Sequence, residues 1–285
     1  MHNLDIHIIA TNNIEGMLFS ETNLLKAASY IKKVRRNSPH LLVLNNANTF
    51  CGSPDADFIA EERNYKRNPV MMAMNQIGYD ASGISAGDLA KGLGFFSQTQ
   101  AMAQFPFLSA NILHPRTKEA FFNTPYILRQ VGTMKVGILG MTATLDFRKH
   151  YSDVFYMERT IHAARRWIRH MRDKENPDYV IVLYYGDIAK VSSYDKMLRA
   201  TEGVDLMLSN SDLNEVIDST WHVGTPQDIS GLTHMQLQFR QRTTTYELMD
   251  FRAEHVSLKG FKEDPYLQDE LYYTLKEWQK KNSTR

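Results

Sequence analysis

The side chains best suited to chemistry lie in loops that follow apolar runs of strand length. Asn13 and Glu15 follow the run at residues 4–10, and Asn48 follows the run at residues 40–44. Carboxylate and amide oxygens of this kind bind Mg²⁺ or Ca²⁺, so one hypothesis is a single weak site for such an ion from Glu15, Asn48 and Asp88. The favoured interpretation is that these residues cap turns and helices. Asp187 and Asp212 have the same two interpretations, as metal ligands or as residues that cap turns and helices.

The patterns of common nucleophilic and histidine-based metal sites do not occur. The sequence has ten histidines, none in a close ligand spacing such as His-x-x-x-His, and we interpret them as satisfied surface or core groups. Cys51 is the single cysteine, so no internal disulfide can form, which fits a reducing compartment. No neighbouring histidine or helix start favours a lowered thiol pKa, and a packing role is expected.

Composition and charge exclude several classes of partner. The chain has 285 residues, of which 43% are hydrophobic, enough for the core of one large domain. Its formal net charge is only +1, so no global field attracts nucleic acid or an anionic membrane. The basic residues at positions 32–36 lie at the end of an expected helix, where cations suit the helix dipole. We therefore expect no nucleic-acid partner and no membrane partner.

Strand and helix patterns alternate along the first two thirds of the chain. Residues 4–10 and 40–44 are expected strands, and Leu24, Ala28 and Ile31 recur between them at helical spacing. A second helix is expected between Asn68-Pro69 and Gly78. Further strands are expected at 107–110, 126–131, 135–141, 179–183 and 204–208, and a helix around 161–171.

The pattern changes to antiparallel strands near the C-terminus. Met235, Leu237 and Phe239 alternate with polar residues, and the alternation resumes at Tyr246 and Leu248. A final amphipathic helix is expected at 264–281, because Asp264-Pro265 is a typical helix start. One face of that helix carries Leu267, Leu271, Leu275 and Trp278. The chain thus predicts a mixed α/β sandwich with a C-terminal helix.

Several segments match the motifs of one family in order and spacing. Thr11-Asn12-Asn13-Ile14-Glu15-Gly16 is similar to Thr-Asn-Asp-Ile-His-Gly, and Asn46-Ala47-Asn48-Thr49-Phe50-Cys51-Gly52-Ser53-Pro54 is similar to Ala-Gly-Asp-Thr-Phe-Gln-Gly-Ser-Pro. Ser85-Ala86-Gly87-Asp88 stands where that family has Gly-Asn-His-Glu, and the segments at 180–185 and 203–213 resemble its strands ending in histidine motifs. The chain resembles the 5′-nucleotidase branch of the calcineurin-like metallophosphoesterases.

The resemblance implies two divalent metals, and each position that holds them in the family is changed here. The ligand positions fall on Asn13, Glu15, Asn48, Ala86, Tyr185, Ser211 and Leu213, and the histidine directed at the phosphate falls on Gly87. Two metals about 3.5–4 Å apart require anionic bridging ligands, and Asn48 is neutral. We therefore expect no catalytic residues and no cofactor, apart from the weak single Mg²⁺ or Ca²⁺ site.

The resemblance also implies the fold and the domain division. It predicts a four-layer αββα sandwich of the metallophosphoesterase type at residues 1–262, and a C-terminal helix and tail at 263–285. In full-length relatives such a helix leads into a second domain that contacts the nucleotide base. This chain ends at the helix, so we expect the leucine stripe to pack on its own sandwich.

Three hypotheses for function remain open. The first is a catalytically degenerate, non-catalytic binding or regulatory module for an unknown protein or small molecule. The second is a phosphoric ester hydrolase with a rebuilt one-metal or metal-free site, and the third is a structural subunit that docks a partner through the C-terminal helix. The start of the chain lacks a signal-peptide pattern, so a soluble, cytoplasmic protein is expected.

Overall fold

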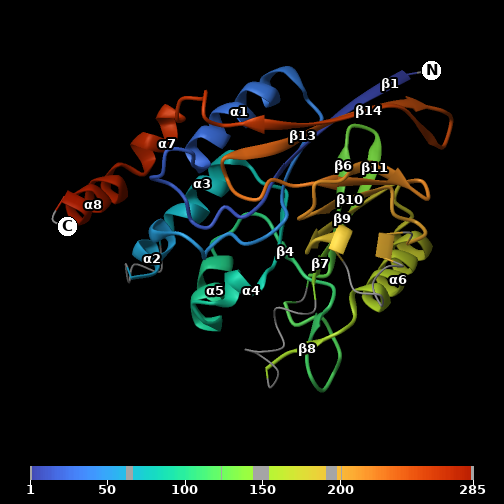
Figure 1. The fold of residues 1–285 in the computed structure, drawn as a ribbon. Helices are drawn as coiled ribbons and strands as arrows, with labels where there is room; N and C mark the ends of the chain where they lie inside the picture. Colours follow the sequence, from blue (N-terminus) through green and yellow to red (C-terminus); the bar gives the residue numbers. More distant parts are fainter. Residues whose placement is uncertain are drawn as a thin grey trace.

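Two six-stranded sheets form the centre of the structure. The computed structural model describes residues 2–61, 67–122, 124–143, 154–190, 198–199 and 201–283, and these residues form two six-stranded sheets and one two-stranded sheet (Figure 1). The first sheet has the order β14 (Tyr246–Ser257), β13 (Gly231–Gln241), β1 (His2–Thr11), β2 (Leu41–Asn45), β3 (Ala81–Gly83) and β4 (Phe107–Leu108). The second has the order β11 (Asn214–Ile217), β12 (Thr220–Gly224), β10 (Leu206–Ser209), β9 (Tyr179–Tyr185), β7 (Met134–Thr142) and β6 (Tyr126–Val131). The small sheet pairs β5 (Ile112–Leu113) with β8 (Tyr156–Met157).

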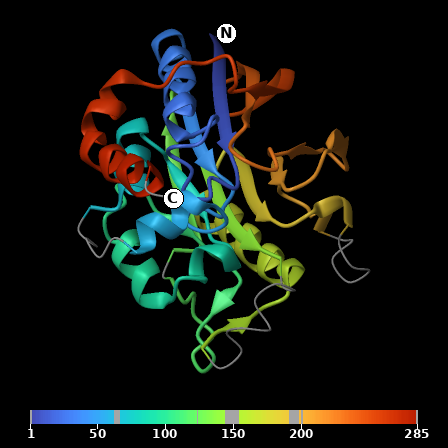
Figure 2. The same cartoon turned by 60° about the vertical axis from the view of Figure 1, so that its left-hand side comes forward.

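Helices cover the outer faces of both large sheets, as Figures 1 and 2 show. The first sheet is covered by α1 (Leu24–Asn37), α2 (Pro54–Glu61), α3 (Pro69–Ile77), α4 (Ala86–Leu89), α5 (Leu93–Gln100), α7 (Pro265–Glu270) and α8 (Tyr272–Ser283). The second is covered by α6 (Thr160–His170), which continues into a π-helical turn (Met171–Glu175). A short 3₁₀ helix (Ile188–Lys190) follows β9. No helix in the described ranges is long and apolar enough to cross a membrane.

Three apolar cores fill the spaces between the four layers. Side chains alternate between the two faces of a strand, so Ile8 of β1 faces the second sheet while Ile9 faces the helices. The core between the sheets joins Ile8 to Ile181 and Leu183 of β9. Val182, on the other face of β9, packs with α6. The predicted four-layer αββα sandwich is confirmed.

Most of the predicted elements are present, with one strand shorter than expected. Asn68 caps α3 by accepting hydrogen bonds from two backbone N–H groups, and Gly78 ends the helix in a left-handed conformation with φ of 78°. The strand expected at 107–110 ends at Leu108. The reason is that the backbone N–H of Ala110 donates to the carbonyl of Gly140 in the second sheet, at 2.8 Å. The chain therefore crosses between the sheets there.

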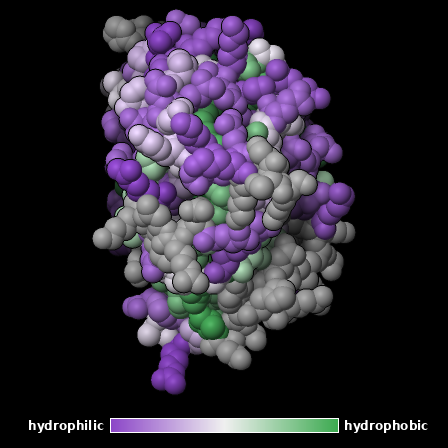
Figure 3. Space-filling view, turned by 90° about the vertical axis from the view of Figure 1, so that its left-hand side faces the viewer, coloured by the Kyte–Doolittle hydropathy of each residue, from purple (hydrophilic) through white to green (hydrophobic). Residues whose placement is uncertain are grey.

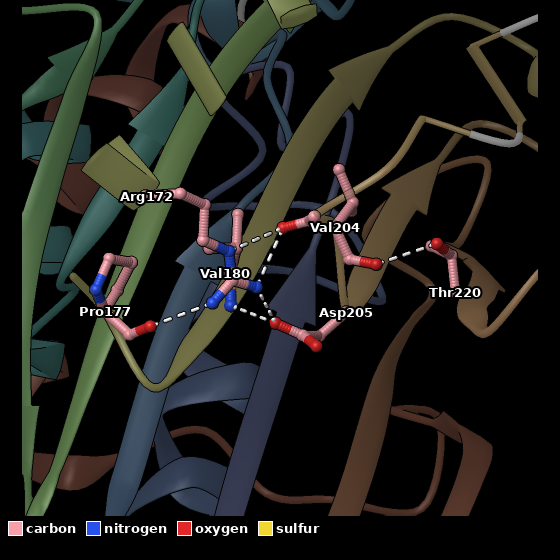
Figure 4. Close-up of polar contacts among 7 residues, drawn as sticks. Arg172, Pro177, Val180, Val204, Asp205 and Thr220 are labelled. Carbon is pink, nitrogen blue, oxygen red and sulfur yellow. Dashed lines mark hydrogen bonds and ion pairs between the residues drawn. The ribbon is translucent and has the colours of Figure 1, made fainter. Parts of the chain in front are cut away.

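A half-buried polar cluster aligns the two central strands of the second sheet (Figure 4). Oδ2 of Asp205, just before β10, accepts from the backbone N–H of Val180 in β9 and from the Arg172 guanidinium, both at 2.7 Å. Arg172 also donates to the carbonyls of Gly203 and Pro177, each at 2.8 Å. Burial raises the pKa of Asp205, although Val180 and Arg172 oppose that shift. The cluster holds the starts of β9 and β10 side by side.

The C-terminal helix packs on the sandwich, but it is interrupted. Asp264 caps it as expected, and α7 ends at Leu271, where φ is −96° and ψ is 7°. Leu267 is 2% and Leu271 1% exposed, and both belong to the core beneath the helices of the first sheet. Trp278 stacks on Phe19 with ring centroids 4.9 Å apart. The single helix expected at 264–281 is thus two helices, because Leu271 turns inward at the break.

Candidate functional site

The carboxyl ends of both sheets meet at one polar site. The hydroxyl of Tyr185, at the end of β9, donates to Oδ1 of Asn13, after β1, at 3.0 Å. Nδ2 of Asn13 in turn donates at 2.7 Å to the carbonyl of Gln227, in the connection from β12 to β13. We call Asn13, Glu15, Asn48 and Tyr185 the loop site. These four residues were selected from the sequence, and the structure brings them together.

Asn48 supplies the central donor of the loop site. Its Nδ2 donates to Oδ1 of Asn13 and to Oε1 of Glu15, each at 3.1 Å. Asn13 and Asn48 are each only 8% exposed, so these bonds are largely shielded from water. An amide nitrogen can only donate. The centre of the site is therefore occupied by an N–H donor that joins the surrounding oxygens.

Three of the four residues have an unusual backbone conformation. Asn13, Glu15 and Asn48 have φ values of 46°, 52° and 58°, in the left-handed region that L-residues seldom adopt. Asparagine tolerates this region better than most residues, but glutamate does not. Such strain persists only where the surroundings impose it, and it clusters at functional sites. The loops after β1 and β2 therefore hold a strained backbone of the kind found at functional sites.

Asp88 lies below the loop site and acts as a cap. It is completely buried, and its carboxylate accepts from the backbone N–H groups of Asn48 at 3.0 Å, Thr49 at 2.6 Å and Ser85 at 2.8 Å. Ser85 and Asp88 also form a reciprocal capping box at the start of α4. Burial raises the pKa of Asp88, and these hydrogen bonds oppose the shift. Its oxygens are engaged with the backbone, as the turn-capping interpretation expects.

Two glycines leave room for the loop-site side chains. A Cβ atom at Gly87 would lie 2.1 Å from Oδ1 of Asn48, and one at Gly52 would lie 2.5 Å from Cδ of Glu15. Both separations are shorter than any real contact of a Cβ atom. Gly87 is the position at which the resemblance in sequence placed the phosphate-directed histidine of the family. No side chain fits at that position while Asn48 keeps its present conformation.

The other positions selected from the sequence have different partners. Ser211 is buried and its hydroxyl contacts that of Ser209 at 2.8 Å. Leu213 packs against the core under α6. Asp187 forms an ion pair with Lys190 at 3.0 Å. Ala86 is half-buried and packs against the core beneath the helices of the first sheet. Asp212 is exposed.

Burial shifts the ionisable groups of this region toward their neutral forms. The pKa of Glu15 is raised by burial and then by the negative charge of Asp228, while the hydrogen bond from Asn48 lowers it. Burial also raises the pKa of the Cys51 thiol, and the nearby Lys91 only partly opposes this. A raised thiol pKa argues against a reactive cysteine. It agrees with the expected packing role.

Several residues of the site were not identified from the sequence. Nδ2 of Asn46 donates at 2.7 Å to Oδ1 of Asn210, and so joins the loop after β2 to the loop after β10. Asn12 donates at 3.0 Å to the carbonyl of Pro226. Asp228 contributes charge from the same connection. Asn12 and Asn46 lie within the family-like motifs, and only that place could have pointed to them. No pattern marks the segment at 226–228.

A pair of histidines forms a separate cluster on the first sheet. Nδ1 of His7 contacts Nε2 of His234 at 2.9 Å, and Nδ1 of His234 contacts the hydroxyl of Tyr30 at 2.8 Å. His234 is 4% exposed, and burial lowers its pKa to about 4. These two histidines are satisfied groups, as the sequence suggested. His150 lies outside the described residues.

Comparison with known proteins identifies the fold. No model of a known protein family matches the sequence. The chain is 23% identical over 214 residues to a 2′,3′-cyclic-nucleotide 2′-phosphodiesterase/3′-nucleotidase of Salmonella typhimurium, which covers 66% of this chain and 31% of that protein. It is 27% identical over 190 residues to the protein UshA of Yersinia enterocolitica, covering 62% and 33% respectively. The chain therefore spans about a third of the length of the curated relatives that it matches.

Solved structures agree with these relatives. The calcineurin-like phosphoesterase YfkN of Bacillus subtilis superimposes with a TM-score of 0.83 and 18% identity, covering 97% of this chain and 98% of that one. The present chain has the calcineurin-like phosphoesterase fold, and its sequence is similar to 5′-nucleotidase-type metallophosphoesterases. A putative 5′-nucleotidase of Staphylococcus aureus gives a TM-score of 0.77 and 16% identity, covering 96% of the domain and 59% of that chain.

These relatives correct one expectation from the sequence. We expected no cofactor, and that expectation is wrong, because the proteins to which the domain is related are metal-dependent phosphoesterases. The loop site offers few groups to a metal ion. Glu15 is its only carboxylate, and Oδ1 of Asn13 already accepts two hydrogen bonds. Within the described ranges no three His, Cys, Asp or Glu side chains are grouped to hold a metal ion. This arrangement does not fit the family's two-metal centre.

Proposed function

We propose that the domain is a non-catalytic binding or regulatory module built on a phosphoesterase fold. The observation that carries the proposal is the hydrogen-bonded loop site, in which Asn48 donates to both Asn13 and Glu15 while Tyr185 donates to Asn13. Phosphoester hydrolysis needs an activated water and groups that stabilise charge on the phosphate. The side chains of the loop site are instead engaged with one another.

The charge of the site also supports this proposal. The side chains that influence Glu15 are the carboxylate of Asp228 and the amide of Asn48. Two carboxylates at the mouth of a site repel a phosphate dianion unless cations offset them. The position corresponding to the phosphate-directed histidine is Gly87, which has no side chain to donate. Neither binding nor activation of a phosphoester is favoured by these residues alone.

A panel of hydrolysis assays tests the proposal. The substrates are p-nitrophenyl phosphate, nucleoside monophosphates and 2′,3′-cyclic nucleotides, each with Mn²⁺ or Mg²⁺ in excess. We expect rates equal to those of buffer with metal. The matched variant is Asn48→Ala, which removes the central donor. Turnover by the natural chain that this variant abolishes would refute the non-catalytic role, because it would assign the activity to the loop site.

A hydrolase with a rebuilt site is the competing hypothesis, and one observation favours it. The raised pKa of Glu15 is a property of carboxyl groups that act as general acids. That hypothesis predicts a rate on the same substrates that Glu15→Gln removes and that depends on pH through the carboxyl group. The third hypothesis, docking through the C-terminal helix, is weakened because Leu267 and Leu271 are buried in the domain's own core.

A further inference from the structure

A cavity lies under the C-terminal helices and shares no residue with the loop site. Its volume is about 200 Å³. One wall comes from α7 and α8 through Glu270, Tyr273 and Glu277, and the other walls come from α2, α3 and α5. The face of the molecule that carries α8 and α2 is shown in Figure 3, where hydrophilic residues predominate and hydrophobic residues appear in small areas between them.

The break at Leu271 explains why the cavity exists. Leu271 turns into the core and Trp278 packs on Phe19 and on Phe58, with a ring-centroid distance of 5.2 Å to Phe58. Glu270 of α7 and Tyr273 and Glu277 of α8 line the cavity beside these anchored residues. These three side chains lie above the helical layer without filling it. The cavity is therefore a consequence of how the two helices are anchored.

The floor of the cavity is apolar and aromatic. Phe58 and Ile59 of α2 are 4% and 6% exposed, and Met72 and Phe95 are half-buried beside them. Ligand sites in proteins are mostly apolar with a few polar groups, and drug-sized ligands need about 300–1,000 Å³. A cavity of about 200 Å³ is smaller than that range. It suits a molecule with a single aromatic ring.

The polar groups at the cavity favour a positive charge. Its lining contains one cationic side chain, Arg67, and two carboxylates, Glu270 and Glu277. Glu277 also pairs with Lys280 at 3.0 Å, but both side chains are mostly exposed, at 60% and 70%, and such pairs contribute little. The ring of Tyr273 is 80% exposed at the rim and offers a face for a cation. We propose that this cavity binds a small organic cation that carries one aromatic ring.

Three probes of similar size and different charge test the proposal. They are 2-phenylethylamine, 2-phenylethanol and phenylacetate, with binding followed by two-dimensional NMR of the whole chain. The amine should bind most tightly and the carboxylate most weakly. Glu270→Gln and Glu277→Gln should each weaken amine binding about two- to fivefold, the range for an exposed ion pair, and leave the alcohol unchanged. Glu215→Gln, at an exposed site on β11, is the matched control and should change neither.

Filling the cavity provides the second arm of the experiment. Met72→Trp adds a ring to the floor and should abolish binding of the amine and the alcohol, provided that its unfolding transition shows a folded protein. If that variant does not fold, Glu270→Gln and Glu277→Gln still test the proposal. No binding of the amine at 10 mM, equal binding of phenylacetate, or amine binding unchanged in both glutamine variants would each overturn the proposal. None of these outcomes bears on hydrolysis at the loop site.

Discussion

Replacing the central donor by an acid tests the polarity of the loop site. In Asn48→Asp the shape is nearly unchanged, and aspartate tolerates the left-handed backbone about as well as asparagine. The substitution removes the donor that serves Asn13 and Glu15 at 3.1 Å each. It also leaves a new carboxylate facing the oxygens of both residues.

The expected cost follows from these contacts. Two lost hydrogen bonds contribute about 1 kcal/mol each. Two carboxylates about 4 Å apart repel by up to about 4 kcal/mol at an effective dielectric constant of about 20, and protonation of Glu15, whose pKa is already raised, relieves part of this. We expect the free energy of unfolding to fall by about 2–5 kcal/mol at pH 8.

Urea denaturation at several pH values measures this effect. Because the new repulsion needs both carboxyl groups charged, the destabilisation should be largest at pH 8 and should shrink as the pH falls toward 5. Asn48→Ala is the control, since it loses the same donors without adding charge. Its dependence on pH should be much weaker, because it comes only from the lost hydrogen bond that lowers the pKa of Glu15. An aspartate variant as stable as the natural chain at pH 8 would show that Asn48 does not act as the central donor.

Three further predictions concern other parts of the domain. Burial lowers the pKa of His234 to about 4 in the folded state from a usual value of 6.5, so protons bind preferentially to the unfolded chain. The contribution of His234 to the free energy of unfolding should therefore be fully present above pH 6.5 and decline as the pH falls toward 4. In urea titrations, His234→Gln should make this decline less steep. An unchanged pH profile would contradict the burial argument. Leu271→Lys combined with Leu275→Lys should lower the melting temperature of a monomer by several degrees, since a buried leucine removed from a core costs about 2–5 kcal/mol. If size-exclusion chromatography instead shows an oligomer that dissociates at an unchanged melting temperature, the helix is an interface. Tyr185→Phe should cost about 0.5–1.5 kcal/mol in urea denaturation through its lost bond to Asn13, and no loss would mean that this bond adds nothing to stability.

Local patterns were sufficient to predict most of the fold. The helix starts at Asn68 and Asp264 and the helix end at Gly78 depend on contacts within three residues, so the sequence reveals them directly. The break at Leu271 was missed because the leucine spacing continues through it, and only packing in the core decides where the backbone turns. The early end of the strand at Leu108 has the same kind of cause, a bond from Ala110 to the other sheet.

The loop site could be predicted only in part. The resemblance placed Asn13, Glu15, Asn48 and Tyr185 in one region, and the structure brings them into contact. The bonds that join the two sheets there connect residues far apart in sequence, such as Asn46 with Asn210 across 164 positions. No periodicity carries information over that distance. The resemblance implied the metal dependence of the relatives, but the altered ligand positions of this chain led to the wrong expectation of no cofactor.

The measurement that tests the central claim most directly is a side-by-side hydrolysis assay. The domain and the YfkN phosphoesterase of Bacillus subtilis, which is a related nucleotide phosphoesterase, would be given the same 2′,3′-cyclic nucleotide and p-nitrophenyl phosphate with Mn²⁺ in excess. We predict product from YfkN and only the background rate from this domain at equal concentration. A rate above background that follows the domain through purification and is lost in Asn48→Ala would contradict the proposed non-catalytic role.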